Sequence, residues 1–299
     1  MFKINHIRKE GNQLTGLELF NTDTALEAKI NLINGASLEQ LKLQGIELIS
    51  DVCLNYKKHF NSAIMFPFAN RVYNGKYAFN GKNYQLAVND PTTNSSLHGL
   101  VYNQTFEVFK IHEDQDKLSV TLVFDQKQET PGFPFMFSLY VTYSFHTNYL
   151  EMQVKIVNNS EQTFPFTLGW HPYFKQSLSS KNQIKLFNGS EITFNNDFEY
   201  QMIPLNSSTL VIGNNTYDHC YLVRSDKIKF ENEAYSMEMK LGNDEHFIQI
   251  YTPSNKEYVA IEPQTGPANS FNNGLGLKTL NPKEIYEQTW NIHLIETNS

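Results

Sequence analysis

Residues 137–145 read FSLYVTYSF, and this segment decides the fold class. Its large apolar side chains recur at every second position, while serine, threonine and one tyrosine fill the positions between them. A period of two is typical of a β-strand with one face against a core and the other toward solvent. The β-branched and aromatic residues of the segment favour the same structure. The side chains expected on the buried face are Phe137, Leu139, Val141, Tyr143 and Phe145.

The same alternation recurs on both sides of this segment. It is present in LSVTLVF at 118–124, in MQVKI at 152–156 and in WNIHL at 290–294. Stretches compatible with a helix, such as SLEQLKL at 37–43, are short and lack a sustained helical period and capping residues. Strands at short spacing with almost no helices predict an all-β chain, built as a sandwich or a barrel.

Turn signals between the strands indicate how the strands are connected. Asn-Gly is the dipeptide best suited to a tight hairpin turn, so it predicts antiparallel hairpins. No linker-like or low-complexity segment divides the chain, and we therefore expect residues 1–299 to form a single domain. The Asn-Gly dipeptides lie at 34–35, 74–75, 80–81, 188–189 and 273–274.

Composition excludes several classes of function. No apolar run approaches the roughly 18 residues of a membrane span, so we expect no membrane partner. A net charge of -7 argues against nucleic-acid partners, which select clustered Lys and Arg. The first 16 residues lack the apolar stretch of a secretion signal, which makes the cytoplasm the expected location. Cys53 and Cys220 are too few for a disulfide framework or a zinc cluster, and we expect two buried thiols.

Five local sequences place ionisable groups beside Gly, Pro or aromatic residues. Arginine is scarce in this chain, so the Arg of FANRVYNG suggests a place that needs its forked donor set, although a solvated surface Arg fits as well. The Glu of VAIEPQTGP ends an apolar strand, and its carboxylate is solvated, paired or functional. The histidines of SSLHGL and GWHPYF and the Asp of TYDHCY are weaker candidates. These five residues are Arg71, His98, His171, Asp218 and Glu262.

The other ionisable residues and the search for metal and cofactor motifs provide weaker evidence about function. His59 lies among charged residues, and His246 beside Asp244 and Glu245 is expected to be solvated. The His and Cys spacings fit no metal site, and no glycine-rich phosphate loop is present. We therefore expect no metal and no nucleotide cofactor.

Six motifs, taken in order, resemble those of the aldose 1-epimerase family, the galactose-mutarotase-like proteins. The resemblance spans essentially the whole chain. It implies a large antiparallel β-sandwich, the galactose-mutarotase-like supersandwich, with an open sugar cleft and no cofactor. The motifs are Asn-Arg at 70–71, Leu-His-Gly at 97–99, PGFPF at 131–135, His-Pro-Tyr-Phe at 171–174, Asp-x-x-Tyr at 218–221 and Glu-Pro-x-Thr-Gly at 262–266.

The resemblance also implies a role for each of the five residues. Glu262 would be the general base that takes the proton of the anomeric hydroxyl, and His171 the general acid that protonates the ring oxygen. Arg71, His98 and Asp218 would bind sugar hydroxyls or the ring oxygen. The implied reaction is interconversion of the α and β anomers of an aldose. For the oligomeric state we expect a monomer or a homodimer.

Departures from the family pattern bear on the identity of the substrate. Val-Tyr, rather than an aromatic-Arg pair, follows Leu-His-Gly-Leu, and Arg8 and Arg224 lie outside the motifs. A free hexose such as galactose or glucose is therefore favoured over a hexose 6-phosphate. A non-catalytic sugar-binding protein and a glycosidase that uses Asp218 and Glu262 are the other hypotheses. Phe174, Tyr102 and Phe271 are the candidates for stacking on the sugar ring.

Overall fold

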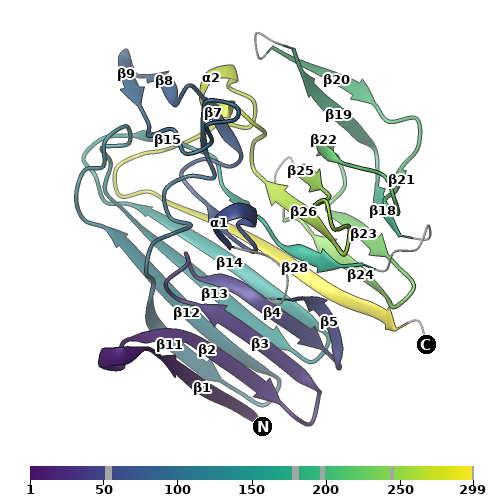
Figure 1. The fold of residues 1–299 in the computed structure, drawn as a ribbon. Helices are drawn as coiled ribbons and strands as arrows, with labels where there is room; N and C mark the ends of the chain where they lie inside the picture. Colours follow the sequence, from purple (N-terminus) through teal and green to yellow (C-terminus); the bar gives the residue numbers. More distant parts are fainter. Residues whose placement is uncertain (51–55, 177–181, 196–198, 243–245, 298–299) are drawn as a thin grey trace.

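The computed structural model describes all residues except 51–55, 177–181, 196–198, 243–245 and 298–299, and antiparallel strands dominate it (Figure 1). The largest sheet has nine strands and extends across the molecule (Figure 1). In spatial order these are β11 (Glu107–Glu113), β12 (Lys117–Gln126), β13 (Phe137–His146), β14 (Tyr149–Asn158), β28 (Ile285–Thr297), β24 (Tyr235–Lys240), β23 (Lys227–Glu231), β18 (Gln183–Leu186) and β21 (Thr209–Val211).

Two further sheets lie against this one. The first has five strands in chain order: β1 (Phe2–Arg8), β2 (Leu14–Asn21), β3 (Leu26–Asn31), β4 (Ser37–Leu43) and β5 (Ile46–Ile49). The second has eight: β20 (Tyr200–Pro204), β19 (Gly189–Phe194), β22 (Asp218–Val223), β25 (His246–Tyr251), β26 (Tyr258–Gln264), β16 (Gly169–Trp170) and β6 (Ile64–Met65), with β17 (Tyr173–Lys175) also paired to β26. The expected all-β class and β-sandwich are therefore confirmed.

Short elements complete the described part of the chain. Three two-stranded pairs are β7 (Arg71–Tyr73) with β10 (Ser95–Leu97), β8 (Lys76–Phe79) with β9 (Lys82–Gln85), and β15 (Phe164–Phe166) with β27 (Lys278–Leu280). The helical elements are η1 (Glu10–Asn12), α1 (Tyr56–His59) and α2 (Ser270–Asn273). Within the described residues, no helix is long and apolar enough to cross a membrane.

The alternation read from residues 137–145 is confirmed. All five large side chains of its apolar face are at most 1% exposed. In the neighbouring strands, Leu122 and Val154 both pair with Val141, and all three are fully buried. Burial of one such aliphatic side chain contributes about 1.5–3 kcal/mol. Hydrophobic burial along this face therefore stabilises the central strands of the nine-stranded sheet.

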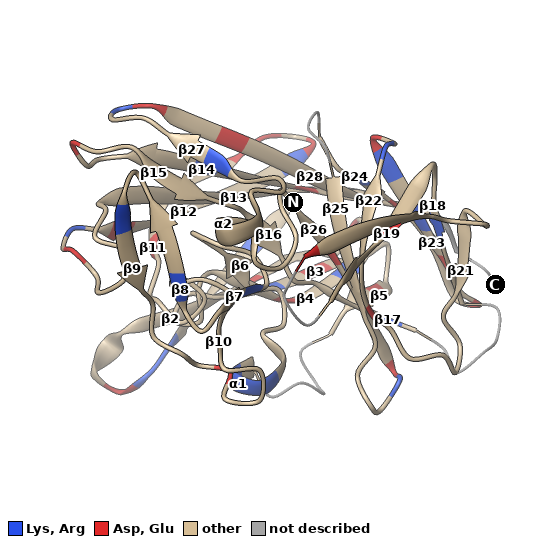
Figure 2. Cartoon of the chain, turned by 90° about the horizontal axis from the view of Figure 1, so that it is seen from above, with Lys and Arg blue, Asp and Glu red and all other residues tan. Residues whose placement is uncertain are grey.

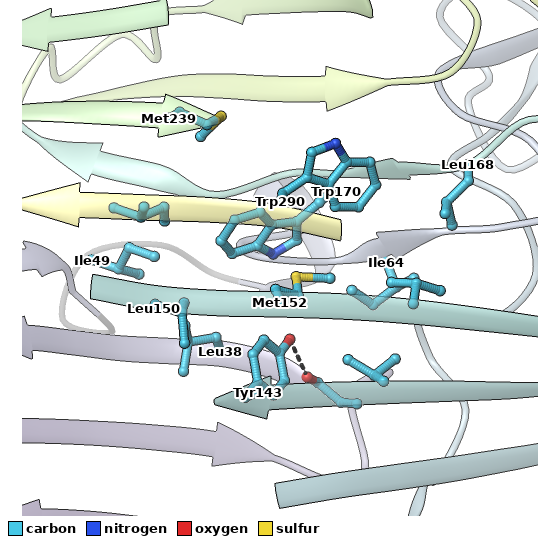
Figure 3. Packing of buried hydrophobic residues seen from close by; sticks show 14 of the residues in the cluster. Leu38, Ile49, Ile64, Tyr143, Leu150, Met152, Leu168, Trp170, Met239 and Trp290 are labelled. Atoms are coloured by element: carbon cyan, nitrogen blue, oxygen red, sulfur yellow. Dashed lines mark hydrogen bonds between the residues drawn. The ribbon is translucent and has the colours of Figure 1, made fainter. Parts of the chain in front are cut away.

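The core joins the sheets across their inner faces. Tyr143 of β13 donates its hydroxyl to the Ala36 carbonyl at 2.9 Å, just before β4 of the five-stranded sheet (Figure 3). On the other side, Trp170 of β16 and Trp290 of β28 lie in the same core cluster (Figure 3). Because Trp170 is fully buried, it anchors the short strand that immediately precedes His171.

Asn-Gly turns form hairpins at only two of the five expected places. Residues 80–81 join the paired strands β8 and β9, and residues 34–35 lie in the connection between β3 and β4. The other expectations were wrong. Residues 74–75 and 188–189 connect strands of different sheets, and 273–274 end α2 with Gly274 at φ 75°. Left-handed backbone suits a change of sheet or a helix end as well as a hairpin.

Three other expectations can be compared with the structure. Residues 37–43 form strand β4, in agreement with the absence of a helical period. Cys220 is buried as expected, while Cys53 lies outside the described residues. His246 was expected in solvent, but it is 8% exposed because β25 extends to it and pairs it with Val223.

Candidate active site

Three neighbouring strands of the eight-stranded sheet present polar side chains on one face. The register pairs Gln249 of β25 with Glu262 of β26. On the other side of β25, Asp218 of β22 pairs with Tyr251, two residues along from Gln249. Directly paired residues share a face, and so do residues two apart in a strand. The intervening side chains, Ile248, Ile250 and Ile261 among them, are buried in the core on the opposite face.

Loops from elsewhere in the chain bring the other ionisable groups to this face. His171 follows β16, and its backbone NH donates to the Ala63 carbonyl at 3.1 Å. His98 follows β10 at φ 61°, and its NH donates to the Asn70 carbonyl at 2.8 Å. Arg71 begins β7 and pairs with Leu97 of β10. Main-chain hydrogen bonds therefore fix the points from which these side chains extend.

Together these groups line a cleft of about 250 Å³. All five residues singled out from the sequence contribute to its wall, although they come from five separate segments. Its lining residues are Lys58, His59, Phe60, Asn70, Arg71, Leu97, His98, His171, Tyr173, Asp218, Gln249, Tyr251 and Glu262.

Glu262 and His171 contact one another inside the cleft. The distance from His171 Nε2 to Glu262 Oε1 is 3.3 Å, and the side chains are only 6% and 2% exposed. Burial raises the pKa of the Glu262 carboxyl well above 4.5, and the Asp218 carboxylate raises it further. Burial lowers the pKa of the His171 imidazole from 6.5 to about 3. Of the two groups, the Glu262 carboxyl therefore holds a proton to higher pH than the His171 imidazole does, and His171 is neutral at neutral pH.

Polar atoms beside this pair lack partners within the described part of the chain. Nδ1 of His98 and Oε1 of Gln264 are buried and accept or donate no hydrogen bond there. The rings of His98 and His171 meet edge to face, with centroids 5.0 Å apart. Burial lowers the pKa of His98 well below 6.5, so this imidazole is neutral. A buried polar atom without a partner costs free energy, which a polar ligand in the cleft can recover.

The aromatic residues expected to stack on a sugar lie elsewhere, so that expectation was wrong. Phe174 packs in the core, because adjacent strand residues face opposite ways, and Tyr173 takes the cleft side. Phe271 packs against Phe68, and Tyr102 contacts Phe60 from outside the cleft lining. The aromatic side chains that line the cleft are Phe60, Tyr173 and Tyr251.

Several lining residues were missed by sequence reasoning. Lys58 and His59 lie in α1, where the lysine positions are coloured blue in Figure 2. The sequence had placed His59 only among charged residues, which gave it no special weight. Gln249 carried a usable signal, since it is the polar interruption of the apolar strand HFIQIY at 246–251. Among the residues that the structure describes, no group of three or more His, Cys, Asp or Glu could hold a metal ion.

Comparison with known proteins agrees with this architecture. The structure is similar to a galactose mutarotase-like protein from Clostridium acetobutylicum, with a TM-score of 0.87 and 19% identity over 99% of each chain. It is also similar to galactose 1-epimerase from Lactobacillus acidophilus, with a TM-score of 0.82 and 17% identity over 99% of each chain. These structural likenesses concern the fold.

Comparison of the sequence with known proteins identifies the family of this chain. The chain is 24% identical over 280 residues to the uncharacterised protein YihR of Escherichia coli, covering 87% of both chains. A family model described as aldose 1-epimerase matches residues 18–293. The expected resemblance is thereby confirmed, and the chain belongs to the aldose 1-epimerase family.

Proposed function

We propose that this protein is a mutarotase that interconverts the α and β anomers of a free aldose such as galactose or glucose. The observation that carries this proposal is the buried Glu262–His171 pair, 3.3 Å apart, in a cleft lined by polar and charged side chains that can hydrogen-bond to sugar hydroxyls. Membership of an isomerase family supports it.

The reaction needs one proton donor and one proton acceptor. Ring opening breaks the bond between the anomeric carbon and the ring oxygen, so one group removes the anomeric hydroxyl proton while another protonates the ring oxygen. The open-chain aldehyde then rotates about its first carbon–carbon bond and recloses. We assign Glu262 as the base and His171 as the acid on opening, and each reverses its role on closing. A positioned acid or base typically contributes about 10²- to 10⁴-fold in rate.

When Glu262 is protonated and His171 is neutral, the free site holds the number of protons that this cycle needs. A protonated Glu262 beside a neutral His171 carries one proton, as does the carboxylate–imidazolium form that the opening step uses. Transfer of that proton between the contacting atoms converts one form into the other without exchange with solvent. Arg71 favours the ionised carboxyl, because its charge lowers the pKa of Glu262.

The remaining groups bind the sugar in this proposal. Asp218 accepts hydrogen bonds from hydroxyls, Arg71 donates to them, and His98 offers its unpaired Nδ1. Tyr173 stacks on His171 with ring centroids 5.0 Å apart and interplanar angle 21°, which holds the imidazole in place. Fixing both reacting groups against one bound ring lowers the entropic part of the barrier.

Substitution of the pair tests the proposal. Glu262→Gln and His171→Asn are each expected to lower the enzymatic rate of anomer interconversion by at least tenfold, about 1.4 kcal/mol or more on the barrier. Polarimetry on freshly dissolved α-galactose and α-glucose measures the rate, with the uncatalysed rate subtracted. Wild-type protein that binds sugar but leaves the uncatalysed rate unchanged would instead favour the sugar-binding alternative. Release of reducing sugar from a galactoside would favour a glycosidase.

Matched controls lie on the opposite face of the same sheet. His219 is exposed beside Asp218 in the chain, and its Nδ1 is 3.8 Å from Oε1 of Glu191. His219→Asn and Glu191→Gln remove the same chemical groups away from the cleft, so both are expected to retain wild-type rates. Equal loss in the control and cleft variants would contradict the assignment.

A second candidate is mutarotation of an anionic aldose such as a hexose 6-phosphate. The exposed Lys58 lines the cleft beside His59, which adds a cation that the arginine count of the sequence did not reveal. If an anionic group binds there, Lys58→Met raises KM for a hexose 6-phosphate more than KM for the free hexose. Equal effects on both substrates would leave the free aldose as the substrate.

A further inference from the structure

Five side chains from four segments of the chain form a continuous series of hydrogen bonds along the cleft. Asp90 Oδ2 accepts from Arg71 Nε at 3.2 Å, and Arg71 Nη1 donates to Asn70 Oδ1 at 3.2 Å. Asn70 Nδ2 donates to Gln249 Oε1 at 3.4 Å, and Gln249 Nε2 donates to Asp218 Oδ1 at 2.7 Å. The four residues from Arg71 to Asp218 all line the cleft. We call them, with Asp90, the polar row.

The two ends of the polar row fix the direction of its hydrogen bonds. A guanidinium can only donate, so the Asn70 amide must turn its oxygen toward Arg71. An ionised carboxylate can only accept, so the Gln249 amide must turn its nitrogen toward Asp218. The central Asn70–Gln249 contact then has one donor and one acceptor. Rotation of either amide would place like groups against each other.

Burial and anchoring hold this arrangement. Asn70 and Gln249 are 5% and 6% exposed, so their amides lack free access to solvent. Asp90 accepts from the Thr93 hydroxyl at 2.7 Å and from the Thr92 backbone NH at 3.1 Å, which fixes the end that holds Arg71. At the other end, backbone pairing fixes Gln249 next to Glu262.

Each charged end retains capacity for a ligand. No hydrogen bond from Arg71 Nη2 or to Asp218 Oδ2 is formed within the described ranges of the chain. The row therefore offers a donor at Arg71 and an acceptor at Asp218. A sugar ring with two free hydroxyls can accept at one end and donate at the other.

We propose that Asn70 and Gln249 are positioning residues that fix the direction of the hydrogen bonds offered to two hydroxyls of the aldose by Arg71 and Asp218. This rests on the proposed function. The ligand class it names is an aldopyranose with two free hydroxyls away from the anomeric carbon. The identity of each amide is therefore required, because a carboxylate of the same shape cannot donate.

A pair of isosteric substitutions tests the direction of the row. In Asn70→Asp, the new carboxylate still accepts from Arg71 but cannot donate to Gln249. The Gln249 amide is then expected to rotate, which turns its oxygen toward Asp218 and leaves that carboxylate without its donor. In Asp218→Asn, the new amide accepts from Gln249 and presents its nitrogen to the sugar where an acceptor is needed. Each variant is expected to raise KM at least tenfold, with kcat changed less than threefold.

The double variant reverses the row instead of breaking it. With Asn70→Asp and Asp218→Asn together, the rotated Gln249 accepts from the new amide, whose oxygen again faces the sugar. We expect KM at least threefold below that of Asp218→Asn alone. Multiplication of the two single effects would overturn the inference, and so would a KM unchanged in Asn70→Asp. A purely structural role for Asn70 predicts no such recovery.

Asn94→Asp is the control for the added charge. Asn94 has φ 52°, close to the 55° of Asn70, and donates through its amide to Asn74 at 2.7 Å outside the cleft lining. We expect its KM to stay at the wild-type value. Circular dichroism of all variants checks that they fold.

A second readout separates this inference from the proposed function. The binding constant of 1,5-anhydrogalactitol, which lacks an anomeric hydroxyl and cannot mutarotate, is measured by calorimetry for the same variants. Wild-type protein that binds this ligand but catalyses no interconversion would overturn the proposed function alone, and the double-variant recovery would then be sought in Kd. Wild-type protein that binds neither the analogue nor a hexose would overturn the inference as well.

Discussion

At the residue scale, the chemistry of the cleft depends on Glu262 and His171, whose order of proton affinity is the reverse of that in water. In water a carboxylate is ionised at pH 7 and an imidazole is about half protonated near pH 6.5. Burial penalises the charged form of both, so the pKa of Glu262 rises and that of His171 falls. The proton then resides on Glu262, and the 3.3 Å contact lets His171 receive it.

This reversal predicts the pH dependence of activity. Adding a second proton to the pair occupies His171, whose pKa has fallen to about 3, so kcat/KM is expected to fall on the acid side only below about pH 5. Removing the single proton ionises Glu262, so activity falls on the alkaline side, at the raised pKa of that carboxyl. The two groups titrate as a pair, because their side chains are in contact. Their neighbours in the cleft are Arg71, Asp218, His59, His98 and Tyr173.

The measurement is kcat/KM by polarimetry at intervals from pH 4 to 9. A fall in kcat/KM centred near pH 6.5 would show that a solvated histidine governs the rate, and the proton assignment would then be wrong. In the His219→Asn control the profile should be unaltered, because that imidazole is exposed on the other face of β22.

At the element scale, the connection after β10 decides where His98 lies. Gly99 follows His98 in the chain and has φ +77°, and a Cβ at Gly99 would lie 2.2 Å from the Phe66 carbonyl oxygen. The Leu100 NH donates to the same carbonyl at 2.7 Å, so the close approach is part of the hydrogen bonding. Only glycine fits both the conformation and the space. The backbone conformation of this loop thus determines the position of His98, for which we propose a role in sugar binding.

Gly99→Ala is therefore expected to destabilise the fold by about 3 kcal/mol, since steric overlap adds to the strain of positive φ. It should also raise KM, because the loop moves with His98. Gly81→Ala is the control, as Gly81 has φ +73° but no atom within 4 Å of the added Cβ, and it should cost about 1 kcal/mol. Urea denaturation measures both. Equal costs would mean that contact with Phe66 does not constrain the loop.

At the scale of the whole molecule, the C-terminal strand connects the two halves of the nine-stranded sheet. β28 pairs with β14 on one side and with β24 on the other, within the nine-stranded sheet. One core cluster contains residues from Phe2 to Leu294. We propose on this basis that the chain is a single domain, because neither half of the sheet is complete without the last strand.

A single domain predicts one cooperative unfolding transition. Trp170 and Trp290 are the two tryptophans of the chain, both are buried, and they belong to different sheets. Their fluorescence and the far-ultraviolet circular dichroism are expected to change at the same urea concentration. Two separated midpoints would show that the chain does not unfold as a single unit.

Much of this architecture could be predicted because alternation is a local property. The period of two in residues 137–145 determined which face of β13 is buried, since successive side chains leave a strand on opposite sides. A position beside Gly, Pro or aromatic residues singled out five ionisable residues, and the structure brings all five to one cleft. They are Arg71, His98, His171, Asp218 and Glu262. Local signals failed where one dipeptide serves several connections, as the Asn-Gly turns show.

The sequence by itself determined the strands, their buried faces and the candidate acid and base. Only the tertiary structure decided that Lys58 and His59 reach the cleft, and that Asn70 donates to Gln249. It also decided the contact of His171 with Glu262. Such contacts depend on which strands pair and in what register, and a shift of one residue would turn every side chain of a strand to the other face. The side chains of the cleft therefore became neighbours through the long-range pairing of sheets.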